Sequence, residues 1–166
     1  MSELTPAEHL KRFLKARASL DGEDTVFWWK GYMYSYIPGQ PSQRLMQIEG
    51  YNVAHVTPID GGYQMVTREV NLYCDSQTGE ILETWHNPLN ERDVNVVHVW
   101  NDPVNQEFLE YGQRGPFMMP TEDLGNGQTC MYFDVMLAYP SPLPRSEYPL
   151  NSQSDLYQGA ELFQFF

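Results

Sequence analysis

Short turn signals that recur after Thr25 constrain the fold of this chain most. Pro38-Gly39, Asp60-Gly61-Gly62, residues 75–79 and residues 87–93 separate strand-like runs at residues 25–37, 43–56, 62–74, 80–86 and 94–101. Connections of about five to seven residues suit hairpins and leave no room for the helices that join parallel strands. The sequence therefore predicts a mostly β fold, an antiparallel up-and-down meander or calycin-like barrel.

A helix is expected ahead of these strands, over about residues 6–19. Thr5 is a good N-cap, Pro6 suits the first helical position, and Glu8 completes a capping box. The residues of its apolar stripe are Leu10, Phe13, Leu14 and Ala18. The cations expected on its solvated face are Lys11, Arg12, Lys15 and Arg17.

The second half of the chain is less regular. We expect an irregular segment at 102–127, a strand at 128–139 and a Pro-rich loop at 140–150, all within a single domain of residues 1–166. The sequence stops on Phe163-Gln164-Phe165-Phe166, an apolar ending that is rarely left in water. We therefore expect further chain or another subunit to cover it, as in a homo-oligomer.

Charge and composition exclude several classes of partner. The chain carries 10 Lys and Arg against 22 Asp and Glu, a net charge of −12, which argues against nucleic acid and anionic membrane surfaces. No apolar run approaches the roughly 18–20 residues that span a bilayer. Cys74 and Cys130 make no disulfide framework and no CxxC pair, so two buried free thiols and a cytoplasmic location are expected.

The most aromatic segment runs from Trp28 to Tyr36 and contains one lysine, Lys30. Ideal hairpins place the even-numbered residues of the meander on one apolar face, which we predict to be the inside. The same registers place Lys30 opposite Gly50, Gly50 opposite Arg68, and Arg68 opposite His86. We call these four residues the predicted cation row.

A buried row of cations needs an anionic partner, because an unpaired buried charge costs several kcal/mol. Arg68 would fork a carboxylate or phosphate, and Gly50 would leave a gap for the head of a ligand. The predicted ligand-binding residues are Lys30, Arg68, His86, Trp28, Tyr32, Tyr34, Tyr36, Gly50 and Trp100. Alternatively, the face lies outside, or Glu49 and Glu69 neutralise these cations as ordinary cross-strand pairs.

Metal and nucleophilic chemistry have weaker support. His55, His86 and His98 are separated by about 13–17 Å in this layout, too far to share one ion, so we expect neither a metal site nor a cofactor. No G-x-S-x-G elbow or glycine-rich phosphate motif is present. Asp102, before Pro103, could act as a base at a barrel rim, or it could simply stabilise a turn.

Three functions remain open on the sequence alone. The leading one is a small-molecule binding protein for an apolar or conjugated ligand with an acidic group. The second is an isomerase, cyclase or lyase with His86 as acid or base and Tyr32 or Tyr34 as proton donor. The third is an assembly module that docks through its apolar C-terminal end.

Several segments resemble a bacterial family known as domain-of-unknown-function family 1838. They are residues 18–22 (ASLDG) with Trp28-Trp29 and Gly31; residues 79–82 (GEIL) with Trp85, Asn87 and Pro88; residues 98–105 (HVWNDPVN); and residues 139–143 (YPSPL). The matches are scattered over most of the chain. The resemblance implies no activity, because none is assigned to the family. It suggests a shortened form or a fragment, and an incompletely closed barrel, since typical members continue beyond the end of this chain.

Overall fold

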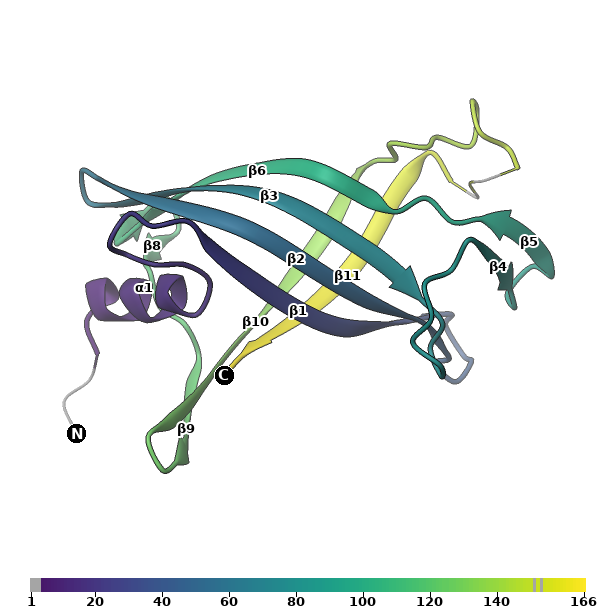
Figure 1. Ribbon diagram of the computed structural model, residues 1–166. Coiled ribbons are helices and arrows are strands. Elements are labelled where there is room, and N and C mark those ends of the chain that lie inside the picture. Colours follow the sequence, from purple (N-terminus) through teal and green to yellow (C-terminus); the bar gives the residue numbers. More distant parts are fainter. Residues whose placement is uncertain (1–3, 151, 153) are drawn as a thin grey trace.

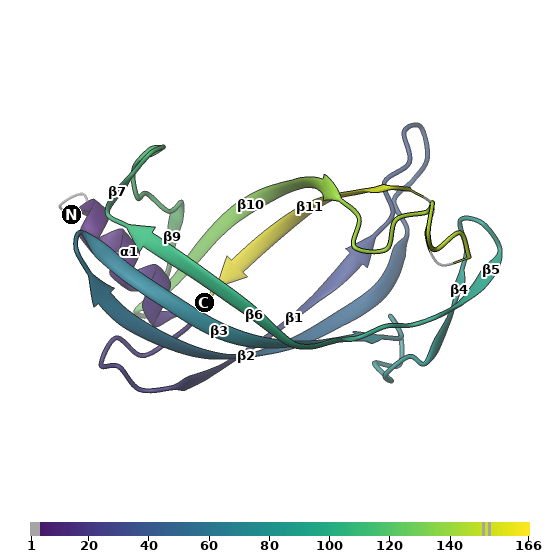
Figure 2. The same cartoon turned by 90° about the horizontal axis from the view of Figure 1, so that it is seen from above.

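The computed structural model describes residues 4–150, 152 and 154–166. Two antiparallel sheets face each other, and we call the region between them, which side chains occupy, the inter-sheet space (Figures 1 and 2). The larger sheet has the order β1 (Thr25–Tyr34), β2 (Arg44–Ile59), β3 (Gly62–Cys74) and β6 (Val99–Leu109). The smaller sheet has the order β11 (Leu156–Phe165), β10 (Gln128–Pro140) and β9 (Thr121–Gly125).

The remaining elements lie at the ends of this assembly. Helix α1 (Pro6–Lys15) lies at one end, near the short ribbon of β7 (Tyr111–Gly112) and β8 (Gly115–Pro116). The ribbon of β4 (Thr84–Asn87) and β5 (Arg92–Asn95) lies at the other end (Figure 2). The predicted mostly β, antiparallel fold with an N-terminal helix is confirmed. Within the described residues the two sheets stay separate, so the barrel is not closed.

Helix α1 begins as its sequence predicts. Thr5 Oγ1 accepts from the Glu8 backbone N–H at 3.3 Å, and the Thr5 backbone N–H donates to the Glu8 carboxylate at 2.7 Å. The helix ends at Lys15, before the predicted residue 19, and the backbone N–H of Arg17 then donates to the Leu14 carbonyl three residues back, which tightens the last turn.

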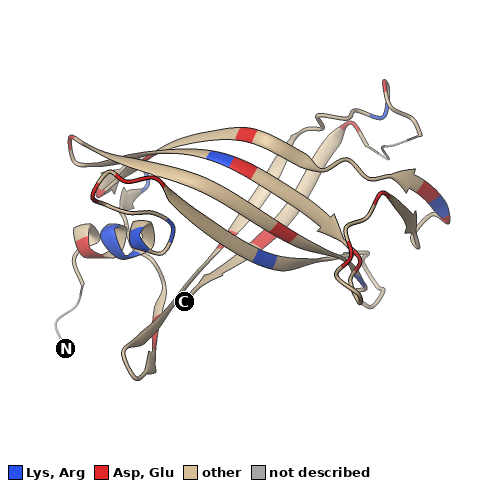
Figure 3. Cartoon of the chain, viewed as in Figure 1, with Lys and Arg blue, Asp and Glu red and all other residues tan. Residues whose placement is uncertain are grey.

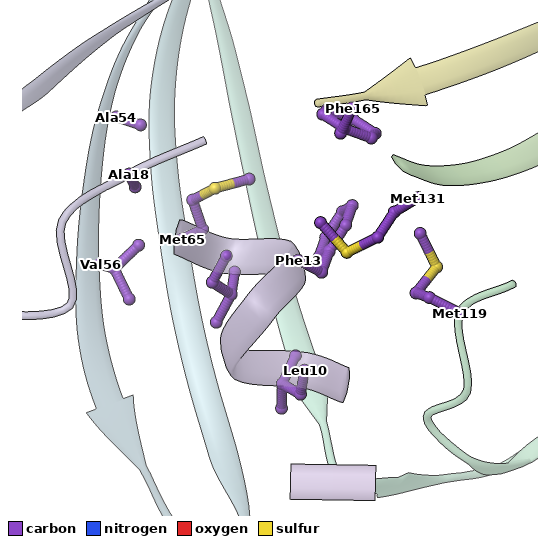
Figure 4. Close-up of a cluster of buried hydrophobic side chains, with 10 residues drawn as sticks. Leu10, Phe13, Ala18, Ala54, Val56, Met65, Met119, Met131 and Phe165 are labelled. Carbon is purple, nitrogen blue, oxygen red and sulfur yellow. The ribbon is translucent and has the colours of Figure 1, made fainter. Parts of the chain in front are cut away.

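The apolar stripe of α1 builds the core between the two sheets (Figure 4). Phe13 is 3% exposed, and its ring lies 5.3–5.9 Å from the rings of four other phenylalanines. These four are Phe108, Phe117, Phe133 and Phe165. Leu10 and Leu14 are fully buried and Ala18 is nearly so, which confirms the predicted stripe. We call this region the phenylalanine end of the inter-sheet space.

The predicted inner face is wrong for β1 and β3, because both hairpin registers differ from the ideal ones. A bulge after Met33 shifts β1 against β2, so the odd-numbered residues of β1 point inward. Strand β2 continues to Ile59 and turns through two residues, Asp60 and Gly61, which moves β3 by three positions. Val66, predicted inside, is therefore 40% exposed, whereas Met65 is fully buried.

The second half contains more strand than expected. Strand β10 agrees with the predicted strand at 128–139, and the turn 125–127 joins it to β9 as a hairpin. Strand β6 extends through Pro103, which an edge strand tolerates because the missing N–H can face away from the sheet. Residues 156–165 pair with β10, and Phe165 lies in the core at 7% exposure.

Both cysteines are free and buried, as predicted.

Candidate functional site

The structure does not assemble the predicted cation row. Lys30 pairs with Glu49 across β1 and β2, and Gly50 pairs with Asn71. Arg68 pairs with Val53 on β2, whereas His86 leaves the sheet and pairs with Asp93 in the β4–β5 ribbon. Figure 3 shows blue segments on β1 and on β3, two strands that β2 separates in the larger sheet.

The predicted aromatic lining points away from the inter-sheet space. Its exposed fractions are 52% for Trp28, 43% for Tyr32, 57% for Tyr34, 89% for Tyr36 and 67% for Trp100. Trp28 and Tyr51 both donate to Glu49 Oε1, at 3.1 and 2.7 Å, and these two hydrogen bonds lower the pKa of Glu49. The open alternative, an outward-facing aromatic face with Lys30 opposite Glu49, describes β1 correctly.

Gly50 leaves no gap for a ligand, because the indole ring of Trp29 covers it. A Cβ atom built on Gly50 would overlap that ring. Trp29 pairs with Gly50 and lies on the inner face of β1. The close approach predicted at Gly50 is therefore made by a side chain of the same sheet.

His86 is held between two carboxylates at the surface. Its Nδ1 lies 2.8 Å from Asp93 and its Nε2 lies 3.2 Å from Glu91. The hydrogen bond with Asp93, and then that with Glu91, raise the pKa of His86 above its usual 6.5. Arg68 lies elsewhere, in a shallow cleft of about 210 Å³ that also includes Asp24 and His55.

Buried hydrogen-bond acceptors occupy the middle of the inner face. The Glu69 carboxylate accepts from the amide nitrogens of Asn52 and Asn71, at 3.0 and 2.9 Å. These bonds orient both amides, and each Oδ1 is then left buried without a partner among the described residues. Asn52 itself is only 3% exposed. A buried acceptor without a donor is costly, so this arrangement needs an explanation.

A second carboxylate comes from the smaller sheet. Glu161 lies on the inward-facing side of β11, between exposed neighbours. Burial raises the pKa of Glu161, and the negative charge of Glu69 raises it further. We call Asn52, Glu69, Asn71 and Glu161 the acceptor cluster. Asp102, the predicted rim base, lies on the edge strand β6, where it pairs with Glu69 of β3. It adds an exposed carboxylate beside that of Glu69.

Three tyrosines extend the cluster away from α1. Tyr139 and Tyr157 stack with their ring centroids 4.9 Å apart. Burial raises the pKa of Tyr73, and the nearby charges of Glu69, Tyr139 and Glu161 raise it further. Tyr73 therefore connects the acceptor cluster with the tyrosine pair. We call this part of the inter-sheet space the polar end.

One cation enters the space from the helix side. The Arg17 guanidinium carbon lies 5.5 Å from the centroid of Phe13 and 5.7 Å from that of Phe27. Burial lowers the pKa of Arg17, and the charge of Glu69 partly opposes this. Arg17, unlike Lys11, Arg12 and Lys15, is therefore not part of the solvated face expected on α1.

A cleft of about 300 Å³ lies at the polar end, between the larger sheet and the β4–β5 ribbon. Met33, Met46 and Tyr73 line it from the sheet, and Arg92 lines it from β5. Its remaining lining residues are Trp85, Asn87, Asn90, Val94, Asn95, Val96, Val97, Leu143 and Leu150. Asn90 Oδ1 is a further buried acceptor without a partner in the described part of the chain. We call this the ribbon cleft.

The described residues contain neither a cluster of metal ligands nor a membrane-spanning helix. No group of three or more His, Cys, Asp or Glu side chains is placed there to hold a metal ion. No helix in those residues is long and apolar enough to cross a membrane.

Sequence reasoning missed the acceptor cluster because it assigned Glu69 and Asn71 to the outer face. Asp60-Gly61 is a two-residue turn signal, and a hairpin closed on it places Glu69 opposite Asn52, as observed. No comparable signal identifies Glu161, since its approach to Glu69 depends on the packing of two sheets.

A family model described as "Protein of unknown function (DUF1838)" matches residues 22–166. The chain belongs to this family, as its sequence segments had indicated. No curated protein and no solved structure matches the chain.

Proposed function

We propose that this DUF1838 member is a small-molecule binding protein whose ligand lies in the ribbon cleft. The observation that carries the proposal is the lining of this cleft, which is mostly apolar and aromatic with a few convergent polar side chains. Its volume, about 300 Å³, is at the lower limit of the range usual for ligand pockets.

The ligand expected from the sequence, an apolar or conjugated molecule with an acidic group, fits this cleft through different residues. Trp85 and Tyr73 offer aromatic surface, and Met33 and Met46 offer adaptable apolar contacts. Arg92 is the one charged side chain among the described residues that line the cleft, and it is exposed at the rim of the cleft. Arg92 would bind the acidic group there, in place of the predicted cation row.

The test compares an acidic and a neutral fluorescent probe. 8-Anilinonaphthalene-1-sulfonate should bind more tightly than uncharged N-phenyl-1-naphthylamine. Arg92→Gln should weaken the sulfonate by about tenfold and leave the neutral probe unchanged, as expected for loss of one charge-assisted contact. Arg114→Gln, an exposed arginine outside the cleft, is the matched control. Equal loss of both probes in both variants, or no binding by the parent protein, would contradict the proposal.

A second candidate function, acid–base catalysis on the bound molecule, has one specific observation in its favour. The expected catalytic residues His86, Tyr32 and Tyr34 are exposed and do not line the cleft. Tyr73 does line it, and Glu161 lies close enough to raise the pKa of that tyrosine. A carboxyl group that keeps its proton longer than usual can serve as a general acid. Turnover of a copurifying molecule, lost in Glu161→Gln while binding persists, would identify this activity.

The assembly function has less structural support. Of the apolar residues proposed to dock on a partner, Phe165 is buried and Phe163 packs against the core. Phe166 alone of the three is largely exposed, at 83%.

A further inference from the structure

The inner surface at the polar end contains buried hydrogen-bond acceptors without donors among the described residues. Glu69 already uses both carboxylate oxygens for the amide nitrogens of Asn52 and Asn71. Each of these amides keeps an oxygen that has no donor among the described residues. Turning either amide round would place its oxygen against the carboxylate, so the orientation is fixed by the network. A hydrogen-bond donor, from a water molecule or from a ligand, would complete this network.

The charges of the surrounding side chains also favour a ligand that donates hydrogen bonds. Glu69 and Glu161 face the inter-sheet space from opposite sheets, and Asp102 lies beside Glu69 at the open edge. Burial lowers the pKa of Arg17, and the charge of Glu69 partly opposes this effect. The Arg17 cation lies over the rings of Phe13 and Phe27 on the helix side. Three carboxylates against one guanidinium leave the surface negative, which favours a positively charged donor.

Two aromatic residues, Trp29 and Tyr73, are inward-facing neighbours of Asn71 in the larger sheet. Trp29 is the register partner of Gly50, which itself pairs with Asn71. Tyr73 is the next inward-facing residue of β3 after Asn71, about 7 Å further along the strand. Carboxylates beside the faces of Trp and Tyr rings form the usual environment for organic ammonium groups in proteins.

Tyr73 also lines the ribbon cleft, so a residue of that cleft is the inward-facing neighbour of Asn71 on β3. We propose that the acceptor cluster binds the protonated amine of an organic ligand whose apolar body lies in the ribbon cleft. This inference rests on the proposed function for the position of the body. It adds that the inner end of the ligand is cationic, whereas Arg92 would meet an acidic group only at the rim.

The experiment uses two probes that share a phenyl body and differ in one end group. 2-Phenylethylamine is protonated at pH 7, and 2-phenylethanol is a neutral molecule of nearly the same shape. Dissociation constants from ligand-observed NMR should favour the amine by about tenfold or more, because its hydrogen bonds to the carboxylates are charge-assisted. Glu161→Gln should remove most of this preference and leave the alcohol unchanged.

Asp134→Asn is the matched control, since it removes the same charge from the neighbouring strand β10 but from its exposed face. It should leave both constants unchanged, and thermal unfolding would verify that both variants are folded. Equal binding of amine and alcohol to the parent would overturn the inference, as would an amine preference that Asp134→Asn lowers as much as Glu161→Gln does. Failure of both phenyl probes and of the naphthalene probes would instead overturn the proposed function, and the inference with it.

Discussion

The two ends of the inter-sheet space are built from the same pair of sheets but are filled in opposite ways. At the phenylalanine end, α1 inserts Phe13 among rings from β6, β10 and β11, and Met65 and Val56 are fully buried beside it. At the polar end none of the described residues forms a helix between the sheets, and the inner face carries Glu69, Glu161 and two asparagines whose oxygens have no partner in that part of the chain. The packing of the phenylalanine end favours stability. The polar end lacks such packing and carries the kind of polar side chains that form a binding site.

This difference in packing indicates which end contributes most to the stability of the fold. Burial of apolar rings is strongly favourable, and a tightly packed ring contacts many neighbours at once. Buried acceptors and like-charged carboxylates are unfavourable unless a donor or cation compensates them. We therefore expect the loss of a ring to cost more at the phenylalanine end than at the polar end, and the loss of a carboxylate at the polar end to be stabilising.

The largest effect is expected for Phe13→Ala. Removing a ring that is 3% exposed and contacts four other phenylalanines leaves a cavity, and should lower the free energy of unfolding by about 3–5 kcal/mol. Tyr157→Ala, at the polar end, removes a ring that is 37% exposed and should cost less than half as much. Urea denaturation followed by circular dichroism measures both. Similar costs for the two variants would mean that the ends do not differ in packing.

The next effect concerns the place beside the acceptor cluster where Trp29 covers Gly50. Gly50→Ala should lower the free energy of unfolding by about 1–3 kcal/mol and shift Trp fluorescence, because the new methyl group overlaps the indole. Gly31→Ala is the control, since a Cβ there meets nothing within 4 Å among the described residues. In a Trp29→Ala background the Gly50 substitution should cost little, which isolates the overlap as the cause.

A smaller effect of opposite sign is expected for Glu161→Gln. The pKa of Glu161 is raised in the folded protein above its usual 4.5, so its stabilising contribution is complete below that pH and is lost as the pH rises through the folded pKa. At pH 7 to 8 the glutamine variant should therefore be the more stable, by less than about 1 kcal/mol because the site is partly solvated. Thermal unfolding at pH 4.5 and pH 8 checks the sign, and a larger gain at pH 4.5 would contradict it.

The smallest effect is expected outside both ends, at His86. Its pKa is raised by hydrogen bonds in solvent rather than by burial, so Asp93→Asn should lower the pKa towards 6.5 with little change in unfolding. Glu91→Gln should lower it less, because its contact is longer, 3.2 against 2.8 Å. NMR titration of the imidazole measures both shifts. The wild-type stabilisation is present below pH 6.5 and is lost as the pH rises through the raised pKa.

Local chemistry allowed much of the fold to be predicted from the sequence. Thr5, Pro6 and Glu8 define the start of α1, since capping depends only on neighbours three residues apart. The alternation of Met131, Phe133 and Val135 predicted β10. The glycine-containing turns predicted antiparallel pairing.

The candidate site could not be predicted in the same way, because it depends on register. One bulge after Met33 and one tight turn at Asp60-Gly61 exchange the faces of β1 and β3. The aromatic side chains of Trp28 and Tyr32, with Lys30, therefore point outward, and Trp29 and Glu69 point inward. A side-chain period of two residues makes the choice of face sensitive to a shift of a single residue.

The sequence by itself determined the fold class, the capped helix, three strands of the larger sheet (β1, β2 and β3) and membership of a family without assigned activity. Only the tertiary structure decided that α1 fills one end of the inter-sheet space. It also decided that Glu161 approaches Glu69 from 92 residues further along the chain. The physical reason is that capping and turn preferences act between near neighbours, whereas burial and charge coupling require two sheets to pack face to face.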